Sequence, residues 1–384
     1  MRRTLYGPDH EAFRESAREF VNRFVLPPRA EELIERHEIP PRDIWIEAGK
    51  AGFLGLEIPP ERFGGMEAGD YRFNAVLAEE FARANMALSS SLGIHSDITV
   101  PYIVHLGNEE QRERWLPRCV TGELICAIGM TEPSGGSDLA NLKTTAVRDG
   151  DDWILNGAKT FITNGYNCDL VVVAARTDPS KGAKGISLLV VERGMEGFEN
   201  GRKLDKVGQP EADTAELFFK DVRVPGKNLL GEEGMGFISM MKLLPQERLG
   251  SAVNNVHHAK HILLETIEYA KERKAFGKAI GTMQYNKFLL AELVTKIEVA
   301  EAYVDQAVEA HADGELSAVD AAKAKWWSAQ TQSEVLDACV QIHGGYGFMN
   351  EYRVARAWKD ARVTKIWAGT NEIMKELIGR DLGL

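Results

Sequence analysis

The middle of the chain contains Met130-Thr-Glu-Pro-Ser-Gly-Gly-Ser-Asp138 and, shortly after it, Trp153-Ile-Leu-Asn-Gly-Ala-Lys-Thr-Phe-Ile-Thr-Asn-Gly165. The first segment follows a predicted strand, and its small residues allow backbone amides to approach a ligand closely. The hydroxyls of Thr131 and Ser137 add two short donors. The same composition also fits a polar glycine-rich loop without a ligand. The GxGxxG spacing of dinucleotide-binding turns and the GxxxxGK[ST] pattern are both missing.

Between about Glu123 and Gly236, hydrophobic residues recur with a period of two. Turn pairs such as Asn156-Gly157 and Pro225-Gly226 separate short predicted strands. Many short strands with little helix between them favour an antiparallel barrel or sandwich over a Rossmann sheet. The predicted strands are Leu124–Met130, Lys143–Val147, Trp153–Asn156, Asp169–Ala175, Ile186–Glu192 and Ala215–Val222.

Helical periodicity flanks this region on both sides. A long helix is predicted from Tyr71 to about Ser90, and long amphipathic helices follow Gly236 in a row that fits an antiparallel bundle. The order predicts an α+β protein with a helical domain over 1–122, a β-barrel or sandwich domain over 123–236 and a helical bundle over 237–384. The C-terminal helices are predicted at Ala252–Lys274, Met283–Ala312, Ala318–His343 and Asn371–Arg380.

The composition excludes several classes of protein. The net charge of −11 argues against a nucleic-acid partner, and no run of about 18 apolar residues predicts a membrane span. Met1 to His10 holds two arginines without a following apolar stretch, so we expect no secretory signal and a cytoplasmic location. The 4 cysteines lack CxxC or metal-ligand spacing, and reduced thiols are expected.

Three histidines lie close together on a predicted helix, at His257, His258 and His261. A metal site needs further ligands and usually an HExxH-like context, which the sequence lacks. We therefore expect a polar helix face here and no metal.

Four further motifs follow the two central segments in order: Leu244-Pro-Gln-Glu-Arg-Leu249, Glu272-Arg-Lys-Ala-Phe-Gly277, Gln341-Ile-His-Gly-Gly-Tyr-Gly347 and Gly369-Thr-Asn-Glu-Ile373. Together, from about Pro8 to Gly379, they resemble the signatures of the acyl-CoA dehydrogenase family. The similarity is closest to its long-chain branch, through the Leu244 motif and through Asp213-Thr-Ala-Glu-Leu-Phe-Phe219 and Asn371-Glu-Ile-Met-Lys-Glu-Leu377.

The resemblance implies the acyl-CoA dehydrogenase fold, with an N-terminal helical domain, a central antiparallel β domain and a C-terminal four-helix bundle. It also implies FAD as cofactor and the oxidation of a long-chain acyl-CoA to trans-2-enoyl-CoA in fatty-acid β-oxidation. In that reaction a base removes an α-proton and a β-hydride passes to flavin N5. The resemblance further implies electron transfer flavoprotein as the electron acceptor and a homotetramer built as a dimer of dimers.

The catalytic base needs an explanation, because many family members have a glutamate where this chain has Ala368. Alanine cannot accept a proton. Long-chain and isovaleryl-type members have their base in the Glu-Arg-Leu segment, which is Glu247-Arg-Leu here, so the resemblance implies Glu247 as the base. The alternative is a structural glutamate in the first turn of a helix.

The resemblance also implies which residues contact ligands. At the substrate it implies Ser137, Arg248, Ala368 and Gly369, with a surface salt bridge as the alternative for Arg248. The small residues of Ala87–Gly93 are expected to leave depth for the acyl chain or, alternatively, to be packed by a neighbouring helix.

The residues that the resemblance implies for FAD fall into three groups. On the β domain they are Ile128, Met130, Thr131, Gly136, Ser137, Phe161, Ile162 and Thr163. At the FAD of a neighbouring subunit they are Arg273, Phe276 and Gln284, with Gln341, Ile342, Gly344 and Gly345 at the same adenine end, and Thr370, Asn371 and Glu372 complete the site.

Three other functions remain open from the sequence. An isovaleryl-type dehydrogenase for short or branched chains would share Glu247, and an acyl-CoA oxidase would pass its electrons to oxygen. Ala368 also fits a flavin-binding homologue that has lost catalysis.

Overall fold

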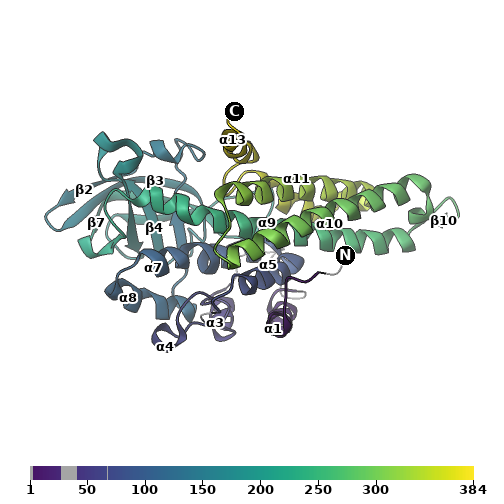
Figure 1. Cartoon of the computed structure of the whole chain (residues 1–384), viewed down its shortest axis with the longest axis horizontal. Coiled ribbons are helices and arrows are strands. Elements are labelled where there is room, and N and C mark those ends of the chain that lie inside the picture. The colour runs from purple at the N-terminus through teal and green to yellow at the C-terminus, as the bar shows by residue number, and fades with distance from the viewer. Residues whose placement is uncertain (1–2, 27–40, 67) are drawn as a thin grey trace.

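The computed structural model describes residues 3–26, 41–66 and 68–384, and it shows helices, then a β-sheet, then long helices (Figure 1). Among these residues, no helix is long and apolar enough to cross a bilayer. The N-terminal helices are α1 (Pro8–Phe24), α3 (Arg42–Lys50), α4 (Pro60–Phe63), α5 (Arg72–Ala84), α6 (Met86–Gly93), the π-helix η1 (Ile94–Thr99), α7 (Val100–Leu106) and α8 (Glu109–Val120).

The predicted continuous helix from Tyr71 to Ser90 is wrong, because it breaks at Asn85. The backbone of Asn85 is extended, with φ −156° and ψ 113°. Its side-chain oxygen accepts a hydrogen bond from the Leu88 amide at 2.9 Å, which begins α6 as a separate helix. Its side-chain nitrogen donates to Glu211 at 2.6 Å, so the break also joins the N-terminal helices to the β domain.

The central strands form an 8-stranded sheet in the order β6-β7-β3-β2-β4-β5-β8, with β1 paired to β4. Most pairs are antiparallel, but β1 runs parallel to β4, from Cys126 opposite Leu170 to Gly129 opposite Val173. The strands β6 and β8 were not predicted, because β6 is polar and glycine-containing and β8 has two residues. The bounds are β1 (Cys126–Gly129), β2 (Thr145–Asp149), β3 (Asp152–Thr163), β4 (Leu170–Arg176), β5 (Ile186–Glu192), β6 (Phe198–Lys203), β7 (Thr214–Val224) and β8 (Leu229–Leu230).

The strand β4 is buried on both faces, and its alternating side chains enter two different cores. Val172 and Ala174 pack with Trp115 and Leu116 of α8, so one face of the sheet is covered by N-terminal helices. Val171 and Val173 pack instead with residues of β3, β5 and β7. The N-terminal helices and the sheet therefore share a hydrophobic core, which fixes β1 and the loop that follows it.

The C-terminal part is built on three long helices, α9 (Gly236–Glu272), α10 (Gln284–Ala312) and α11 (Ala318–His343). The short helices α12 (Arg353–Ala361) and α13 (Asn371–Asp381) pack along α11, and α5 packs along α9. Between α9 and α10, the strands β9 (Lys274–Ala275) and β10 (Lys278–Ala279) form a hairpin at the end of the bundle that lies opposite the β domain (Figure 1).

The helix α9 is longer than predicted, since it begins at Gly236 and not at Ala252. Pro245 lies inside it, and a proline normally ends a helical pattern. The first residue of α9 touches β5: a β-carbon on Gly236 would lie 2.8 Å from the carbonyl carbon of Ser187. The bundle is therefore anchored to the sheet by close backbone contact.

We expect Gly236→Ala to lower the free energy of unfolding by about 1 to 3 kcal/mol, because the added methyl group must displace the backbone of β5. Gly379→Ala is the matched control, since a β-carbon on Gly379 meets nothing within 4 Å. Thermal unfolding of the two variants measures the difference. Equal melting midpoints would contradict the close contact at Gly236.

Candidate functional site

Glu247 lies buried on α9, and its carboxylate accepts a hydrogen bond from the Tyr102 hydroxyl at 3.1 Å. Burial raises the pKa of Glu247 to about 7, although the Tyr102 hydroxyl and the charge of Arg248 act in the opposite direction. A carboxyl group with a pKa near neutrality can both take up and release a proton at physiological pH.

The alternative of a structural glutamate in a first helical turn is wrong. α9 begins at Gly236, so Glu247 lies three turns inside the helix. The field of a helix end falls off within its first turn, and it cannot stabilise a carboxylate at this depth. The helix dipole therefore does not stabilise the charged form of Glu247 and does not offset the cost of burying it.

Ala368 lies beside the same face of α9. The Arg248 Nε donates a hydrogen bond to the Ala368 carbonyl at 3.5 Å, and the Trp367 indole donates to the Ser251 hydroxyl at 3.1 Å. Glu247 and Ala368, the two alternative positions for the base, thus belong to neighbouring segments of one site. The alternative of a surface salt bridge for Arg248 is wrong, because Arg248 is buried.

A second, half-buried carboxyl group, that of Asp97 on the π-helix η1, lies near enough to Glu247 to act on its charge. Asp97 accepts hydrogen bonds from Asn74 at 3.0 Å, Gln246 at 3.1 Å and Tyr71 at 3.1 Å. Burial, together with the charge of Glu57, raises the pKa of Asp97 to about 7. The negative charge of Asp97 in turn raises the pKa of Glu247. Sequence analysis missed Asp97 and Tyr102, because no local pattern marks either residue.

The glycine-rich loop after β1 is held by a buried ion pair. The Lys159 ammonium donates to Glu132 at 2.8 Å and to the Met130 carbonyl at 3.2 Å, and Glu132 also accepts from the Thr144 amide at 2.9 Å. Burial alone would raise the pKa of Glu132, but these hydrogen bonds hold it at about 2. The loop is therefore fixed from inside, while its outer part stays exposed.

The exposed part of this loop offers unused donors. Neither the Thr131 nor the Ser137 hydroxyl has a hydrogen-bond partner among the described residues, and the amides of Gly136 and Ser137 likewise have none there. A β-carbon on Gly136 would lie 3.3 Å from the Thr131 side chain, so the glycine keeps the loop compact. Free hydroxyls and amides on a fixed loop fit the phosphate and ribityl groups of a flavin nucleotide. Ile128 and Met130 are half-buried where β1 enters this loop.

Phe161 is presented by a β-bulge in β3. The pairing of β3 with β7 shifts register between Lys159 and Ile162, and Phe161 has a left-handed backbone with φ 58°. Its ring is 70% exposed, whereas Ile162 is buried and Thr163 is half-buried. A bulge commonly re-aims a side chain next to a ligand site, and an exposed ring here fits stacking on a flavin.

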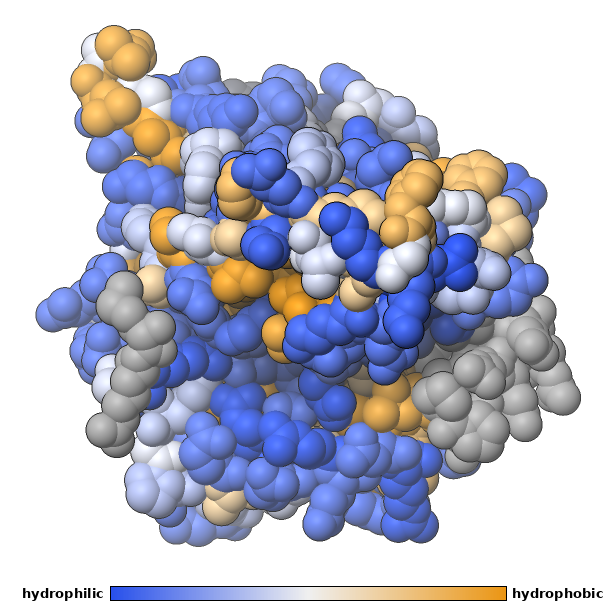
Figure 2. Space-filling model, turned by 90° about the vertical axis from the view of Figure 1, so that its right-hand side faces the viewer, coloured by the Kyte–Doolittle hydropathy of each residue, from blue (hydrophilic) through white to orange (hydrophobic). Residues whose placement is uncertain are grey.

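A second group of predicted FAD residues lies at the other end of the bundle. At 1.5 Å per residue, Arg273 at the end of α9 is about 39 Å from Glu247. Phe276 forms the turn of the β9–β10 hairpin with φ 51° and is 96% exposed. Figure 2 views this end of the molecule, where apolar side chains lie exposed among charged ones. Also at this end are Gln284, Gln341, Ile342, Gly344 and Gly345, while the Arg273 guanidinium lies 5.6 Å from the Tyr346 ring.

The structure thus separates the predicted FAD residues into two groups that one chain cannot bring together. The first group, on the β domain, lies at the opposite end of the molecule from the hairpin (Figure 1). The predicted contact of Arg273, Phe276 and Gln284 with the FAD of a neighbouring subunit is compatible with this separation.

The last motif lies at the start of α13. The Thr370 hydroxyl accepts a hydrogen bond from the Ile373 amide at 3.2 Å and caps the helix, while Glu372 is exposed in the first turn. The Asn371 side chain is buried and faces α11, where its nitrogen donates to the Trp326 carbonyl at 3.4 Å. Its polar atoms are therefore used within the chain.

The small residues of Ala87–Gly93 lie on α6, next to α9. The Ser89 hydroxyl donates to Asn254 at 2.7 Å, and Asn254 lies two turns beyond Glu247 on the same face of α9. The buried Ser91 hydroxyl has no partner among the described residues, and a β-carbon on Gly93 would meet nothing within 4 Å. The segment is thus placed about 10 Å along α9 from Glu247, with room beside Gly93.

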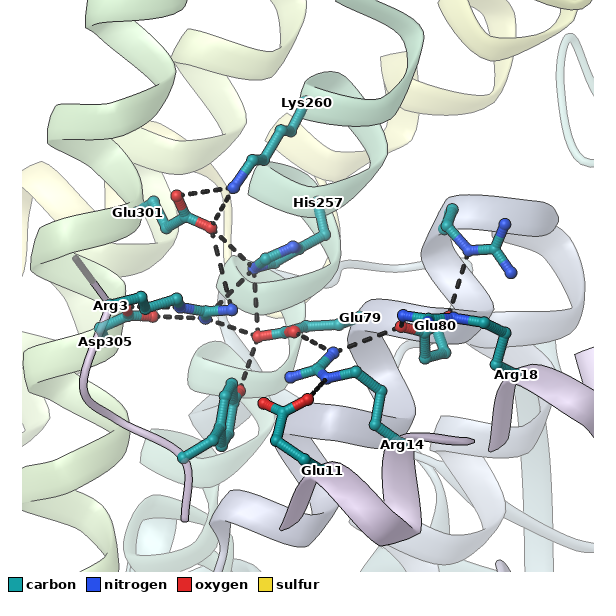
Figure 3. A network of polar contacts seen from close by, with 12 residues as sticks. Arg3, Glu11, Arg14, Arg18, Glu79, Glu80, His257, Lys260, Glu301 and Asp305 are labelled. Carbon is teal, nitrogen blue, oxygen red and sulfur yellow. Dashed lines mark hydrogen bonds and ion pairs between the residues drawn. The ribbon is translucent and has the colours of Figure 1, made fainter. Parts of the chain in front are cut away.

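Another polar cluster joins the N-terminal segment to the bundle (Figure 3). Arg3 pairs with Glu79 at 2.5 Å and with Asp305 at 2.6 Å, and the His257 ring lies 3.2 Å from Glu79. A cavity of about 360 Å³ lies beside this cluster. The acidic and basic groups of the cluster pair with one another, and His257 lies about three turns from Glu247. We therefore assign the cluster a structural role.

The three histidines do not form a polar face as predicted. His258 is buried and meets the Gln332 side chain at 3.0 Å, His257 is half-buried beside Glu79, and His261 pairs with Glu265 at 3.0 Å. Within the described residues, no group of His, Cys, Asp and Glu is arranged to hold a metal ion. The four cysteines are free and buried.

Comparison with known proteins gives one consistent result. Family models described as acyl-CoA dehydrogenase N-terminal, middle and C-terminal domains match residues 7–123, 127–222 and 234–383. The mitochondrial long-chain specific acyl-CoA dehydrogenase of Sus scrofa is 47% identical over 382 residues, covering 99% of this chain and 88% of that protein. The mitochondrial isovaleryl-CoA dehydrogenase of Pongo abelii is 36% identical, covering 94% and 87%.

Solved structures agree with these relatives. The acyl-CoA dehydrogenase from Geobacillus kaustophilus superposes with a TM-score of 0.96 at 46% identity, covering 99% of each chain. A chain from a structure titled for the electron transferring flavoprotein of Acidaminococcus fermentans superposes with a TM-score of 0.94 at 37% identity, covering 100% of this chain and 99% of that one.

We expect Lys159→Met to lower the free energy of unfolding by about 3 to 5 kcal/mol, because it leaves the Glu132 carboxylate buried without its cation. Lys227→Met is the control, since the Lys227–Glu110 pair is exposed and contributes less than about 1 kcal/mol. Chemical denaturation measures both values, and hydrogen exchange of 130–138 reports on the loop. Similar losses in the two variants would show that the buried pair does not fix the loop.

Proposed function

Because the chain belongs to the acyl-CoA dehydrogenase family, whose members are FAD-dependent oxidoreductases, we propose that it oxidises a long-chain acyl-CoA to trans-2-enoyl-CoA with Glu247 as the base. The observation that carries this proposal is the buried carboxyl group of Glu247, with a pKa raised to about 7, beside a turn that has Ala368 and no carboxylate. Glu247 thus offers a base matched to neutral pH at a site where position 368, which is a glutamate in many family members, has no carboxylate.

In the proposed reaction the acyl group loses one proton and one hydride, and each has an acceptor. The Glu247 carboxylate takes the α-proton, and the electron pair of that C–H bond forms the new double bond as the β-hydrogen leaves as hydride. FAD, when bound, supplies the acceptor for this hydride at N5 and is reduced by two electrons. Backbone amides of Ala368 and Gly369 would hold the thioester oxygen while negative charge develops on it. Arg248 and Ser137 would lie at the substrate.

The FAD contacts are proposed in two sets. The free hydroxyls of Thr131 and Ser137, the amide of Gly136 and the exposed Phe161 would hold the flavin on the β domain, with Ile128, Met130, Ile162 and Thr163 beside it. The hairpin end of the bundle would complete the site of a neighbouring subunit through Arg273, Phe276, Gln284, Gln341, Ile342, Gly344 and Gly345. Thr370, Asn371 and Glu372 would complete the site near α13.

A cofactor shared between subunits supports a homotetramer built as a dimer of dimers. Electron transfer flavoprotein is the proposed electron acceptor, supported by the similarity to a chain from a structure titled for such a flavoprotein. A role in β-oxidation and a cytoplasmic location complete the proposal.

The preference for long chains rests on two observations. The long-chain enzyme of Sus scrofa is more similar than the isovaleryl enzyme of Pongo abelii, at 47% against 36% identity. On α6, Ser89 contacts α9 about two turns from the base, and one turn further along α6 Gly93 has open space beside it. The isovaleryl-type enzyme is the second candidate, since it would use the same glutamate.

The proposal is tested by mixing FAD-loaded protein anaerobically with acyl-CoAs of graded length and following flavin absorbance. Long-chain substrates should bleach the wild type. Glu247→Gln, which keeps the shape but cannot take the proton, should slow bleaching at least about 10³-fold while still binding the thioester.

Glu268→Gln on the exposed face of α9 serves as the matched control and should bleach like wild type, because Glu268 is exposed and pairs with Lys271 one turn away. A Glu247→Gln variant as fast as wild type would exclude Glu247 as the base. Bleaching by isovaleryl-CoA in place of long chains would favour the second candidate, and a wild type that no thioester bleaches would support a non-catalytic flavin protein.

Tyr102→Phe should shift the pH dependence of flavin reduction to higher pH by roughly one unit. The Tyr102 hydrogen bond stabilises the charged form of Glu247, so its loss raises the pKa of the base. The base acts as a carboxylate, and the rate therefore rises with pH through this pKa. Stopped-flow bleaching between pH 5 and 9 measures the shift, with Tyr303→Phe in the bundle as control. A shift to lower pH would contradict the assignment.

A further inference from the structure

The ammonium group of Lys325 lies inside the protein, and no carboxylate of the described residues lies within ion-pair distance of it. Lys325, on α11, is 0% exposed and makes no ion pair with the described residues. Burial, with the nearby positive charge of Arg248, lowers the pKa of Lys325 to about 7, although the negative charge of Glu372 acts in the opposite direction. A methionine of similar length would fill the same space without this desolvation cost, so packing alone does not explain a lysine here.

Lys325 reaches the turn that contains Ala368. Its Nζ donates to the Gly369 carbonyl at 2.6 Å and to the Asn371 side-chain oxygen at 3.3 Å. Both acceptors lie in the segment that joins Ala368 to α13. A single side chain of α11 thus fixes the end of this segment against the bundle.

The turn is in a conformation that needs such support. Ala368 has φ 52° and Gly369 has φ 89°, two consecutive left-handed residues. For alanine this conformation costs about 1 to 2 kcal/mol, because its β-carbon crowds the carbonyl oxygen. On the other side, Arg248 donates to the Ala368 carbonyl at 3.5 Å. Each peptide unit is planar, so the Ala368 carbonyl is rigid with the Gly369 amide and the Gly369 carbonyl is rigid with the Thr370 amide. Arg248 therefore holds the first of these two units, and Lys325 holds the next unit and with it the end of the turn.

We propose that Lys325 is a positioning residue for the dehydrogenation: by binding the Gly369 carbonyl and Asn371 it holds the Ala368–Gly369 amides toward the thioester oxygen. This inference rests on the proposed function, in which those amides stabilise the developing charge. It assigns to α11 a role in the chemistry although Lys325 itself touches neither base nor substrate.

The test compares Lys325→Met, which removes the donor, with Lys325→Gln, which keeps an N–H donor without the charge. In FAD-loaded protein, Lys325→Met should lower the limiting rate of anaerobic bleaching roughly 10- to 100-fold, with less than about a threefold change in half-saturating acyl-CoA. Lys325→Gln should recover most of the loss. Lys323→Met is the matched control on the exposed side of α11, where Lys323 pairs with Asp320, and it should behave like wild type.

A second readout does not depend on turnover. The infrared carbonyl band of enoyl-CoA bound to the wild-type holoenzyme should move to lower frequency than in solution, because the amides polarise the thioester. Lys325→Met should lose part of this displacement, and Lys325→Gln should retain most of it. If Lys325→Met fails to fold, Lys325→Gln is compared with Lys323→Met instead. Lys325→Gln should then show a loss of rate and of band displacement that is smaller than the loss expected for Lys325→Met but absent from Lys323→Met.

The outcomes separate this inference from the proposed function. A wild type that bleaches, with Lys325→Met equal to it in limiting rate per bound flavin and in carbonyl band, overturns the role of Lys325 alone. A lower melting midpoint in Lys325→Met with an unchanged rate and band shows a structural role and also overturns it. A wild type that no acyl-CoA bleaches overturns both.

Discussion

The site depends above all on keeping the Glu247 carboxylate out of water. Burial favours its neutral form, while the hydrogen bond from Tyr102 and the charge of Arg248 favour its ionised form. The balance leaves the pKa near 7, where a carboxyl group is a stronger base than an exposed glutamate. Tyr102, Arg248 and Asp97 are held by α7, α9 and η1, so the packing of the N-terminal helices on α9 sets the strength of the base.

The proposed mechanism divides the work between Glu247 and the turn at Ala368. Position 368 contributes its backbone, and its left-handed conformation directs amides instead of a side chain. The proposed base, Glu247, lies separately in the interior of α9. A chain with this division can change the residue at position 368 without losing its catalytic base, provided that the turn keeps its shape.

The sequence predicted the regular elements well and their irregularities poorly. The strand Ile186–Glu192 and the helix Ala318–His343 were predicted to the residue, because their hydrophobic patterns are continuous. The break at Asn85 and the start of α9 before Pro245 were missed, since tertiary contacts with Glu211 and β5 decide them. Glu247 was identified because a family motif contains it. Tyr102 lies 145 residues away from it, and only the folded chain brings the two together.

In the proposed assembly, the helix α9 connects two tasks that belong to different active sites. It holds Glu247 three turns from its start and, about 39 Å further on, the hairpin proposed to complete a neighbour's cofactor site. Loss of one residue between them would rotate the hairpin by about 100° and impair the neighbour while leaving the chain's own base in place. In the proposed assembly, a chain defective at Glu247 and a chain defective at Phe276 would then complement each other. A mixed oligomer would regain one working site from two inactive parents, so some inherited defects of such an enzyme would mask one another when combined.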